Sequence, residues 1–495
     1  MEKNEQLLAL ADELKPELFH RNITRTGKGQ ALKCGDAEVF DFGEHLTGTI
    51  CLDLSTCGKH PDAPVRLAIK FAENQCEFEE NPEDYHGWLS SSWIQHETIH
   101  IDTIPCRYSL PRRYAFRYIR VEVTGISDRY SLLIQSVSCC ASTSADDSIL
   151  SPVNTGDQEL DAIDSAACIT LRECMQDVFE DGPKRDRRLW LGDLRLQALA
   201  ESVTYKNFDL IKRCLCMFAG MPLENGLLPA CVFTEPEYEA DDTINLDYSL
   251  MFIPALLDYY EATGDVDFIR LMWPAAKRQL ELASAYYDES GRLKEPEPPA
   301  RWFIDWNLSL DRTASAYGVH LYCLRSGIRL AGILDDKPAE AQYREEFERR
   351  RLTASEILFD KELGLFISGE EKQISMASQI WAVLGGICCD AAIFDRAKAT
   401  DVLPIVSPYL YHYYVEALLR LGEEEKAFDV IRFYWGGMLK NGADTFWELY
   451  NPENPFESPY GGTIVNSYCH AWSCTPSYFI RKKYNTNSQK HSEKK

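Results

Sequence analysis

One stretch of the sequence, FEDGPKRDRRLWLGD at residues 179–193, interleaves carboxylates with arginines. The Gly182-Pro183 pair ends one helix and the apolar run after Leu189 starts another, so these charges are expected on a loop between two helices. Burial raises the pKa of a carboxyl group and a neighbouring arginine lowers it, so such a loop can supply one proton donor and one base. The alternative is a salt-bridged connection that does no chemistry.

Three further loops combine acids with Trp, Tyr or His: residues 229–249, 295–313 and 442–472. Aromatic faces pack on the C–H surfaces of sugars, and carboxylates accept hydrogen bonds from sugar hydroxyls. Two carboxyl groups that flank a glycosidic bond can hydrolyse it, since one protonates the leaving oxygen and the other activates water or attacks the sugar. The four loops together therefore predict a carbohydrate site. The basic, acidic and aromatic residues on them that we expect to contact substrate include Arg185, Trp302, Asp305, Trp306 and Trp447.

The spacing of apolar residues differs along the chain, and it predicts the helices and strands that would position these loops. Residues 1–30 predict an N-terminal helical segment. Residues 31–145 contain short alternating runs such as FDFGEHLTGTI and YAFRYIRVEV, which predict an antiparallel β-sandwich domain.

Residues 146–481 carry about ten to twelve segments of helical period, many ending in Gly or Asn. A single (α/α)6 barrel takes up this number of helices, and its loops at one mouth would hold the site. A helical-repeat solenoid is the alternative, although the sequence has no fixed repeat. Residues 482–495 form a polar, basic tail for which we expect disorder.

The composition narrows the range of partners. The net charge of −25 argues against nucleic acid and anionic membrane surfaces, because both require a basic footprint. No apolar run approaches the roughly 20 residues of a membrane span, and the N-terminus lacks a signal peptide, so we expect a cytoplasmic protein.

The 17 cysteines are scattered and predict small buried side chains rather than metal ligands. No cofactor is expected, and barrel edges left uncovered would be natural places for a homo-oligomer contact.

From about residue 36 to about residue 480, the chain resembles glycoside hydrolase family 78, the α-L-rhamnosidases. FDFGEHLTGTI and YAFRYIRVEV resemble the β-sandwich that precedes the family's barrel, and DGPKRDRRLWLGD resembles its acid-rich signature loop. YWGGMLKNGADTFWE resembles the segment that ends in the family's catalytic Glu, and SYCHAW resembles the stretch with its substrate-contacting His.

The resemblance implies roles for individual residues. Glu448 falls on the general base, which activates water in an inverting hydrolysis. The family's usual general acid, a Glu, falls at Arg187, and the adjacent Asp186 is the nearest replacement, followed by Asp193 and Asp181. The positions that the resemblance assigns to substrate binding are Asp181, Trp190, Asp193, Asp305, Trp306 and His470.

The implied activity is removal of a terminal α-L-rhamnosyl or similar deoxy-sugar residue from a small oligosaccharide or glycoside. Two alternatives remain open from the residues. Another (α/α)6 glycosidase could act on anionic uronides, for which Arg185, Arg187 and Arg188 would supply positive charge. A non-catalytic carbohydrate-binding relative would account for the missing Glu.

Overall fold

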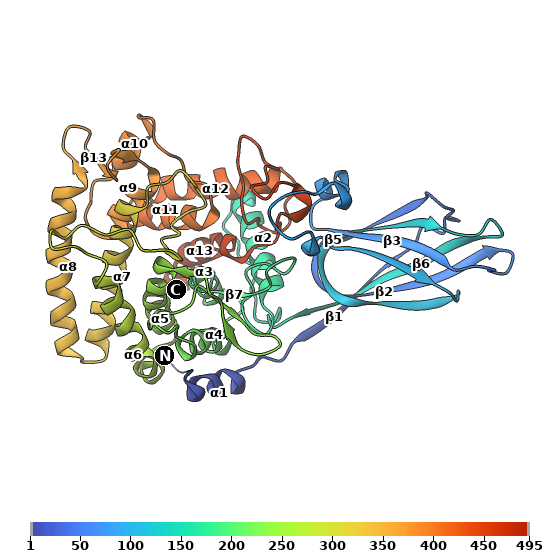
Figure 1. Ribbon diagram of the computed structural model, residues 1–495, viewed down its shortest axis with the longest axis horizontal. Coiled ribbons are helices and arrows are strands. Elements are labelled where there is room, and N and C mark those ends of the chain that lie inside the picture. Colours follow the sequence, from blue (N-terminus) through green and yellow to red (C-terminus); the bar gives the residue numbers. More distant parts are fainter. Residues whose placement is uncertain (1–2, 493–495) are drawn as a thin grey trace.

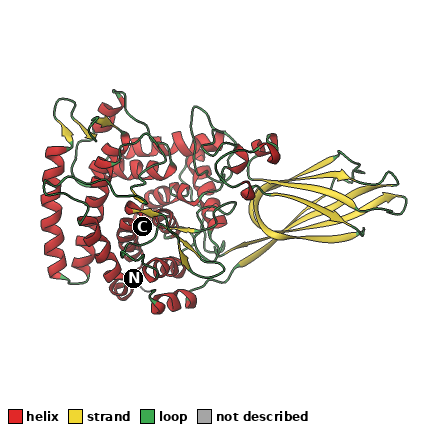
Figure 2. Ribbon diagram, viewed as in Figure 1, coloured by secondary structure: helices red, strands yellow, loops and turns green. Residues whose placement is uncertain are grey.

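A sheet domain and a helical domain lie end to end, so the molecule is elongated (Figures 1 and 2). The computed structural model describes residues 3–492, with only the backbone described for 485–492. No helix in this part of the chain is long and apolar enough to cross a membrane.

The sheet domain is built from six strands in the order β1-β6-β2-β5-β3-β4, each antiparallel to its neighbours. One face of the sheet is apolar, as in β3, where Val65, Leu67 and Ile69 are buried and alternate with more exposed residues. The strands are β1 (Phe19–Thr26), β2 (Ala37–Gly58), β3 (Val65–Ala72), β4 (His96–Ile101), β5 (Cys106–Gly125) and β6 (Tyr130–Thr143).

The beginning of the chain differs from the helical segment expected over residues 1–30. Only α1 (Glu5–Glu13) is helical, and Phe19–Thr26 is an edge strand paired with β6. Most of this strand is exposed, so its sequence carries no alternation that would reveal it. Helix α1 packs against α4 (Phe208–Gly220) of the helical domain, and Leu7 and Leu8 are buried there.

Residues 73–95, here called the β3–β4 loop, leave the sheet and extend to the helical domain. The loop is organised by three short 3-10 turns, η1 (Gln75–Glu79), η2 (Pro82–Asp84) and η3 (Ser91–Trp93). At η1, Asn74 and Glu77 form a capping box, in which each side chain satisfies a backbone N–H of the other.

Twelve helices make up the helical domain in the described part of the chain. Helices α3, α5, α7, α9 and α11 each pack on the next of this series, and each also packs on the helix that follows it in sequence. The helices are α2 (Gln158–Cys174), α3 (Leu191–Glu201), α4 (Phe208–Gly220), α5 (Leu246–Thr263), α6 (Val266–Ser284), α7 (Thr313–Ile333), α8 (Lys337–Ile357), α9 (Met376–Leu384), α10 (Ile393–Lys398), α11 (Pro408–Arg420), α12 (Glu424–Lys440) and α13 (Pro476–Ser492).

Short strands and turns connect these helices. One three-stranded sheet consists of β7 (Leu189–Trp190), β8 (Cys231–Phe233) and β9 (Glu239–Ala240). The others are β10 (Ile244–Asn245) with β11 (Ala300–Arg301), and β12 (Phe359–Asp360), β13 (Leu365–Ser368) and β14 (Gln373–Ile374). Two more 3-10 turns, η4 (Thr463–Val465) and η5 (Ala471–Ser473), follow α12.

The predicted tail of residues 482–495 is helical as far as Ser492, and residues 493–495 lie outside the described part. Helix α13 is anchored by buried residues before this stretch. Ile480 is fully buried, and Arg481 forms an ion pair with Asp164 of α2 at 2.7 Å. Helix α13 therefore begins with residues anchored in the core and extends into the stretch for which composition predicted disorder.

Candidate active site

The loop between α2 and α3, which carries the interleaved charges, is closed at its neck by two hydrogen bonds. The amide of Asp181 donates to the carbonyl oxygen of Arg188 at 3.0 Å, and the amide of Arg188 donates to the carboxylate of Asp181 at 3.0 Å. At the tip, Asp186 and Arg187 have φ values of 60° and 54°. This left-handed backbone costs roughly 1–3 kcal/mol in residues other than glycine and is concentrated at functional sites.

The carboxylate of Glu448, in the loop after α12, receives a donor at each oxygen. Arg185 donates to one oxygen through Nη2, and the hydroxyl of Tyr460 donates to the other at 2.5 Å. The same guanidinium donates from Nε to the carbonyl oxygen of Val465 at 2.9 Å and lies 4.4 Å from the centre of the Tyr460 ring. Burial, with the charge of Glu448, raises the pKa of Tyr460, so its hydroxyl stays protonated as a donor. Glu448 is thereby oriented by two partners.

Asp186 faces the other terminal nitrogen of the Arg185 guanidinium. Its carboxylate is 3.8 Å from Nη1 of Arg185, and its side chain is 24% exposed, whereas that of Glu448 is 7% exposed. Burial raises the pKa of Asp181 well above its usual value, and the charges of Asp186 and Asp193 raise it further. The structure therefore brings four of the predicted carboxylates together. Asp181, Asp186 and Glu448 act on the Arg185 guanidinium, and Asp193 lies near Glu448 and Asp181.

Asp193 and His470 form a buried pair at the start of α3. His470 Nε2 and Asp193 Oδ1 are 3.2 Å apart, and burial raises the pKa of Asp193 although His470 partly opposes the shift. Among the described residues, Nδ1 of His470 is buried and has no hydrogen-bond partner. The ring of Tyr248 fills the space beside Gly192, where a Cβ atom would lie 2.4 Å from the ring.

Arg187, at the position where the resemblance places a catalytic Glu, faces the sheet domain. Its Nη2 donates to the carbonyl oxygen of Arg113 in β5 at 3.1 Å. Burial lowers the pKa of Arg187 to about 10, and the charge of Arg113 contributes. The side chain at 187 therefore contributes to the domain junction, and the neighbouring Asp186 faces Arg185.

The sheet domain fixes the loop at a second point. Lys184, 1% exposed, donates to Glu77 of the β3–β4 loop at 2.5 Å and to the carbonyl oxygen of Asn466 at 2.8 Å. Glu80 of the same loop accepts hydrogen bonds at 2.7 Å from the amide and the hydroxyl of Thr463. The β3–β4 loop therefore contacts both the loop between α2 and α3, which carries Arg185, and the loop after α12, which carries Glu448.

Aromatic side chains from four loops surround this region, and the residue pattern pointed to only some of them. The indole nitrogens of Trp190 and Trp306, like those of Trp302 and Trp381, are buried without a hydrogen-bond partner among the described residues. Phe303 packs edge-on against Trp306 and stacks on Trp472 at 6.1 Å. The rings that complete this wall are Tyr248, Tyr409, Tyr460 and Trp472. Tyr248 and Tyr409 lie in the first turns of helices, where helical period alone classifies them as core.

Three predicted contacts have protein partners instead of lining the site. Trp447 is 1% exposed and packs against other aromatic rings. Asp305 accepts from the amides of Val406 and Ser407, both at 2.9 Å, so it joins two loops. Trp302 is 3% exposed and packs edge-on against Tyr286. The geometry of each is that of a structural residue.

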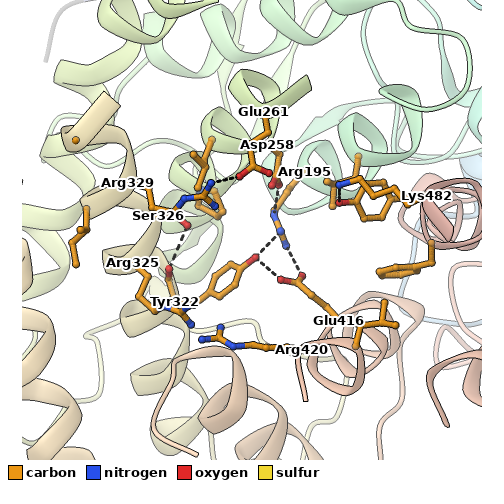
Figure 3. A pocket seen from close by; sticks show the side chains of 18 of the residues that line it. Arg195, Asp258, Glu261, Tyr322, Arg325, Ser326, Arg329, Glu416, Arg420 and Lys482 are labelled. Carbon is orange, nitrogen blue, oxygen red and sulfur yellow. Dashed lines mark hydrogen bonds and ion pairs between the residues drawn. The ribbon is translucent and has the colours of Figure 1, made fainter. Parts of the chain in front are cut away.

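A cavity of about 940 Å³ lies at the opposite ends of the helices whose first turns carry the site (Figure 3). Arg195 at its floor pairs with Asp258 at 2.9 Å and with Glu416 at 3.3 Å, and donates to Tyr322 at 2.6 Å. These residues tie α3, α5, α7 and α11 together. None of the predicted site residues lines this cavity.

Known families match both domains of the chain. Residues 17–141 match the glycosyl hydrolase family 78 α-rhamnosidase N-terminal domain, and residues 149–483 match the bacterial α-L-rhamnosidase six-hairpin glycosidase domain. A search of curated proteins gave no match.

Solved structures show the same relationship. A rhamnosidase from Klebsiella oxytoca, solved with rhamnose bound, is 40% identical, with a TM-score of 0.93, over 97% of this chain and 99% of its own. A family 78 rhamnosidase of Bacillus sp. GL1 is 24% identical, with a TM-score of 0.74, over 91% of this chain and 47% of its own. The α-L-rhamnosidase of Streptomyces avermitilis, complexed with L-rhamnose, is 20% identical, with a TM-score of 0.67, over 94% of this chain and 44% of its own. The chain therefore belongs to glycoside hydrolase family 78, the α-L-rhamnosidase family, and is a glycoside hydrolase.

Proposed function

We propose that the protein removes a terminal α-L-rhamnosyl or similar deoxy-sugar residue from a small oligosaccharide or glycoside, by single displacement with inversion. Asp186 protonates the glycosidic oxygen as the bond from that oxygen to the anomeric carbon breaks. Glu448 takes a proton from the water that attacks the opposite face of the anomeric carbon. The observation that carries this assignment is that Asp186 and Glu448 approach the two terminal nitrogens of the same guanidinium, that of Arg185.

That arrangement suits a reaction in which water stands between the base and the sugar. A single displacement needs the two carboxylates far enough apart to admit both sugar and water, and Asp186 and Glu448 approach different terminal nitrogens of the Arg185 guanidinium. Asp186 is more exposed than Glu448 and sits in a left-handed turn that directs it toward Arg185 while Arg187 faces the sheet domain. These features support Asp186 as the donor in place of the family's Glu.

The remaining polar groups suit recognition of a neutral sugar. We assign hydroxyl contacts to Asp181, Asp193 and Nδ1 of His470, and packing on the sugar ring to Trp190 and Trp306. Support comes from the buried, unpaired nitrogens of His470 and the two indoles, which a sugar hydroxyl would satisfy. The relative from Klebsiella oxytoca was solved with rhamnose, which is such a sugar.

The uronide alternative is less well supported because the arginines of the loop are already engaged. Arg185 pairs with Glu448, Arg187 donates to a backbone carbonyl, and Arg188 lies 3.7 Å from Asp241. Each of the three arginines therefore already has a protein partner, which makes it less available to a substrate carboxylate.

The helical domain is proposed to be an (α/α)6 barrel, with α3, α5, α7, α9, α11 and α13 as its inner ring. Support comes from the packing of successive members from α3 to α11, from the ring contact of His412 in α11 with Phe479 in α13, and from the contacts of α13 with α3 that close the series. The curved antiparallel sheet is proposed to be the sandwich-type domain that precedes it. All 17 cysteines are free, which agrees with a reducing, cytoplasmic location.

Leaving-group dependence tests the two catalytic assignments. Nitrophenolate leaves without a proton, whereas an alkoxide requires one, so Asp186→Asn should lose far more rate on methyl α-L-rhamnoside than on 4-nitrophenyl α-L-rhamnoside. Glu448→Gln should lose about 10²- to 10⁴-fold on both. Asp181→Asn and Asp193→Asn serve as matched variants: if either shows the leaving-group pattern and Asp186→Asn does not, Asp186 is not the acid.

A binder without catalysis would show no turnover in the wild type. NMR of the first-formed anomer distinguishes inversion from retention.

A further inference from the structure

The β3–β4 loop of the sheet domain is fixed against the loop that carries Tyr460. The hydroxyl of Tyr85 donates to the carbonyl oxygen of Tyr460 at 2.9 Å. Gly87 approaches the same carbonyl so closely that a Cβ atom would lie 1.8 Å from it, so only glycine fits. With the Glu80 contacts to Thr463, these bonds make the tip of the loop a rigid part of the helical domain's rim.

Trp88 is at this tip and combines two properties that seldom occur together. Its side chain is 66% exposed, yet its indole nitrogen donates to the carbonyl oxygen of Pro459 at 2.9 Å and its ring packs 5.4 Å from that of Tyr460. An exposed indole that is held in one orientation presents a fixed apolar surface to solvent. Single exposed apolar residues are common, but most are not tethered by both a hydrogen bond and a ring contact.

The location of Trp88 relates it to the reacting groups. Tyr460 lies between Trp88 and Glu448, to which its hydroxyl donates at 2.5 Å. On another side of Tyr460 is Trp306, 6.4 Å away, which comes from the helical domain. A sugar bound by the buried Asp181, Asp193 and His470 must direct its leaving group outward, because the inner groups are enclosed by protein. The exposed rim that carries Trp88 is where such a group would emerge.

We propose that Trp88 forms a binding site for the leaving group of the substrate, on which a flat apolar face, either an aromatic ring or the C–H face of a second sugar, packs. This inference rests on the proposed function, since it places the departing part of the same glycoside. It gives the sheet domain a direct contact with substrate in addition to its support of the two loops.

The test compares three α-L-rhamnosides that share the sugar and differ in the leaving group: methyl, 4-nitrophenyl and a rhamnosyl-hexose disaccharide. Trp88→Ala is expected to lower kcat/KM for the substrate that packs on it by about 3- to 10-fold relative to the methyl glycoside. Trp88→Phe keeps a ring and loses the bond to Pro459, so it should retain most of the preference. The inhibition constant of free rhamnose should change less than twofold. The matched control is Phe433→Ala, a 59% exposed aromatic on the outer face of α12.

The two larger substrates distinguish the two kinds of flat face. A loss confined to the nitrophenyl glycoside indicates an aromatic leaving group, and a loss confined to the disaccharide indicates a sugar. Equal losses on all three substrates, a weaker inhibition by rhamnose, or no change on any substrate would overturn the Trp88 site while leaving the hydrolase intact. If the wild type hydrolysed none of the three substrates, the proposed function would be overturned, and the Trp88 site with it.

Discussion

Arg185 donates a hydrogen bond to Glu448 across the junction of two loops that are far apart in the sequence. The pair is buried, with 5% and 7% of the two side chains exposed, and an ion pair in such surroundings depends on its geometry, because both charges have lost water. The second nitrogen of the guanidinium faces Asp186. One residue thus determines where both proposed catalytic carboxylates lie.

Replacing Arg185 with Lys should lower kcat by about 100-fold with a smaller effect on rhamnose inhibition. Lys retains the charge but is a single flexible point donor, so it cannot hold Glu448 and face Asp186 at once, and displacement of a catalytic group by about 1 Å costs rate of this order. The rate on 4-nitrophenyl rhamnoside is the measurement. Arg21→Lys, at a half-exposed pair with Glu44, is the control and should be neutral. Wild-type kcat in Arg185→Lys would show that the bridge does not position the carboxylates.

Tyr460→Phe should lower kcat/KM by about 10-fold or more, because it removes the hydroxyl that donates to Glu448 at 2.5 Å. Hydrogen bonds to a charged group contribute roughly 1.5–3 kcal/mol. The ring remains, so the contacts with Trp88 and Trp306 remain as well. Tyr450→Phe, whose hydroxyl accepts from Asn441 rather than contacting Glu448, is the matched control. If both variants hydrolyse at the same rate, Tyr460 serves only to pack the loop.

The identities of the carboxylates were accessible from the sequence, and their exact partners were not. The charged loop and the resemblance placed Asp181, Asp186 and Asp193 together, and the structure brings them together with Glu448. Composition alone cannot show that one guanidinium lies between two acids. That relation depends on how the loops after α2 and α12 fold against each other.

The same limit explains the aromatic residues. Trp447 follows the pattern of a sugar platform because it adjoins Glu448, yet neighbouring side chains point in different directions and it enters the core. Tyr409 shows the reverse. The helical period predicts a core residue, but its position in the first turn of α11 places its ring in the aromatic wall beside Trp472. The role of the sheet domain was also hidden, since the β3–β4 loop has no periodic pattern and its contacts with the active-site loops are with residues distant in the sequence.

The buried bridge between Lys184 and Glu77 should be essential for joining the domains. Burial raises the pKa of Glu77 to about 7, Glu73 adds to the shift, and Lys184 opposes it. Lys184→Met would leave Glu77 buried without its cation, which typically costs about 3–5 kcal/mol. We expect a lower midpoint of thermal unfolding and reduced activity, because the charged loop loses its anchor.

The double variant Lys184→Met/Glu77→Gln tests whether the lost stability comes from the uncompensated charge. It should recover a large part of the midpoint, because the neutral amide no longer needs a cation. A double variant no more stable than Lys184→Met alone would instead attribute the loss to the bond between Lys184 and the carbonyl of Asn466.

Glu201, at the end of α3, should make the protein less stable as the pH rises. The residue is fully buried, and burial raises its pKa from 4.5 to about 8. Below about pH 4.5 the carboxyl is protonated in both the folded and the unfolded chain, so it contributes no pH dependence. Between about pH 4.5 and 8 the unfolded chain releases the proton while the folded chain keeps it. The free energy of unfolding therefore falls with pH in this window, by up to about 1.4 kcal/mol for each pH unit from this group.

Glu201→Gln removes this titration while keeping the shape of the side chain, so its midpoint of thermal unfolding should exceed that of the wild type increasingly from pH 5 to pH 8. Only two hydrogen bonds, from the backbone amide of Asn207 and the hydroxyl of Thr204, favour the ionised form, and no cation is among the groups that shift the pKa of Glu201. Glu362→Gln, on an exposed turn, is the control. It should leave the difference between the unfolding midpoints at pH 5 and pH 8 the same as in the wild type. A constant offset between Glu201→Gln and the wild type across this range would show that Glu201 ionises in the folded protein as readily as in the unfolded chain.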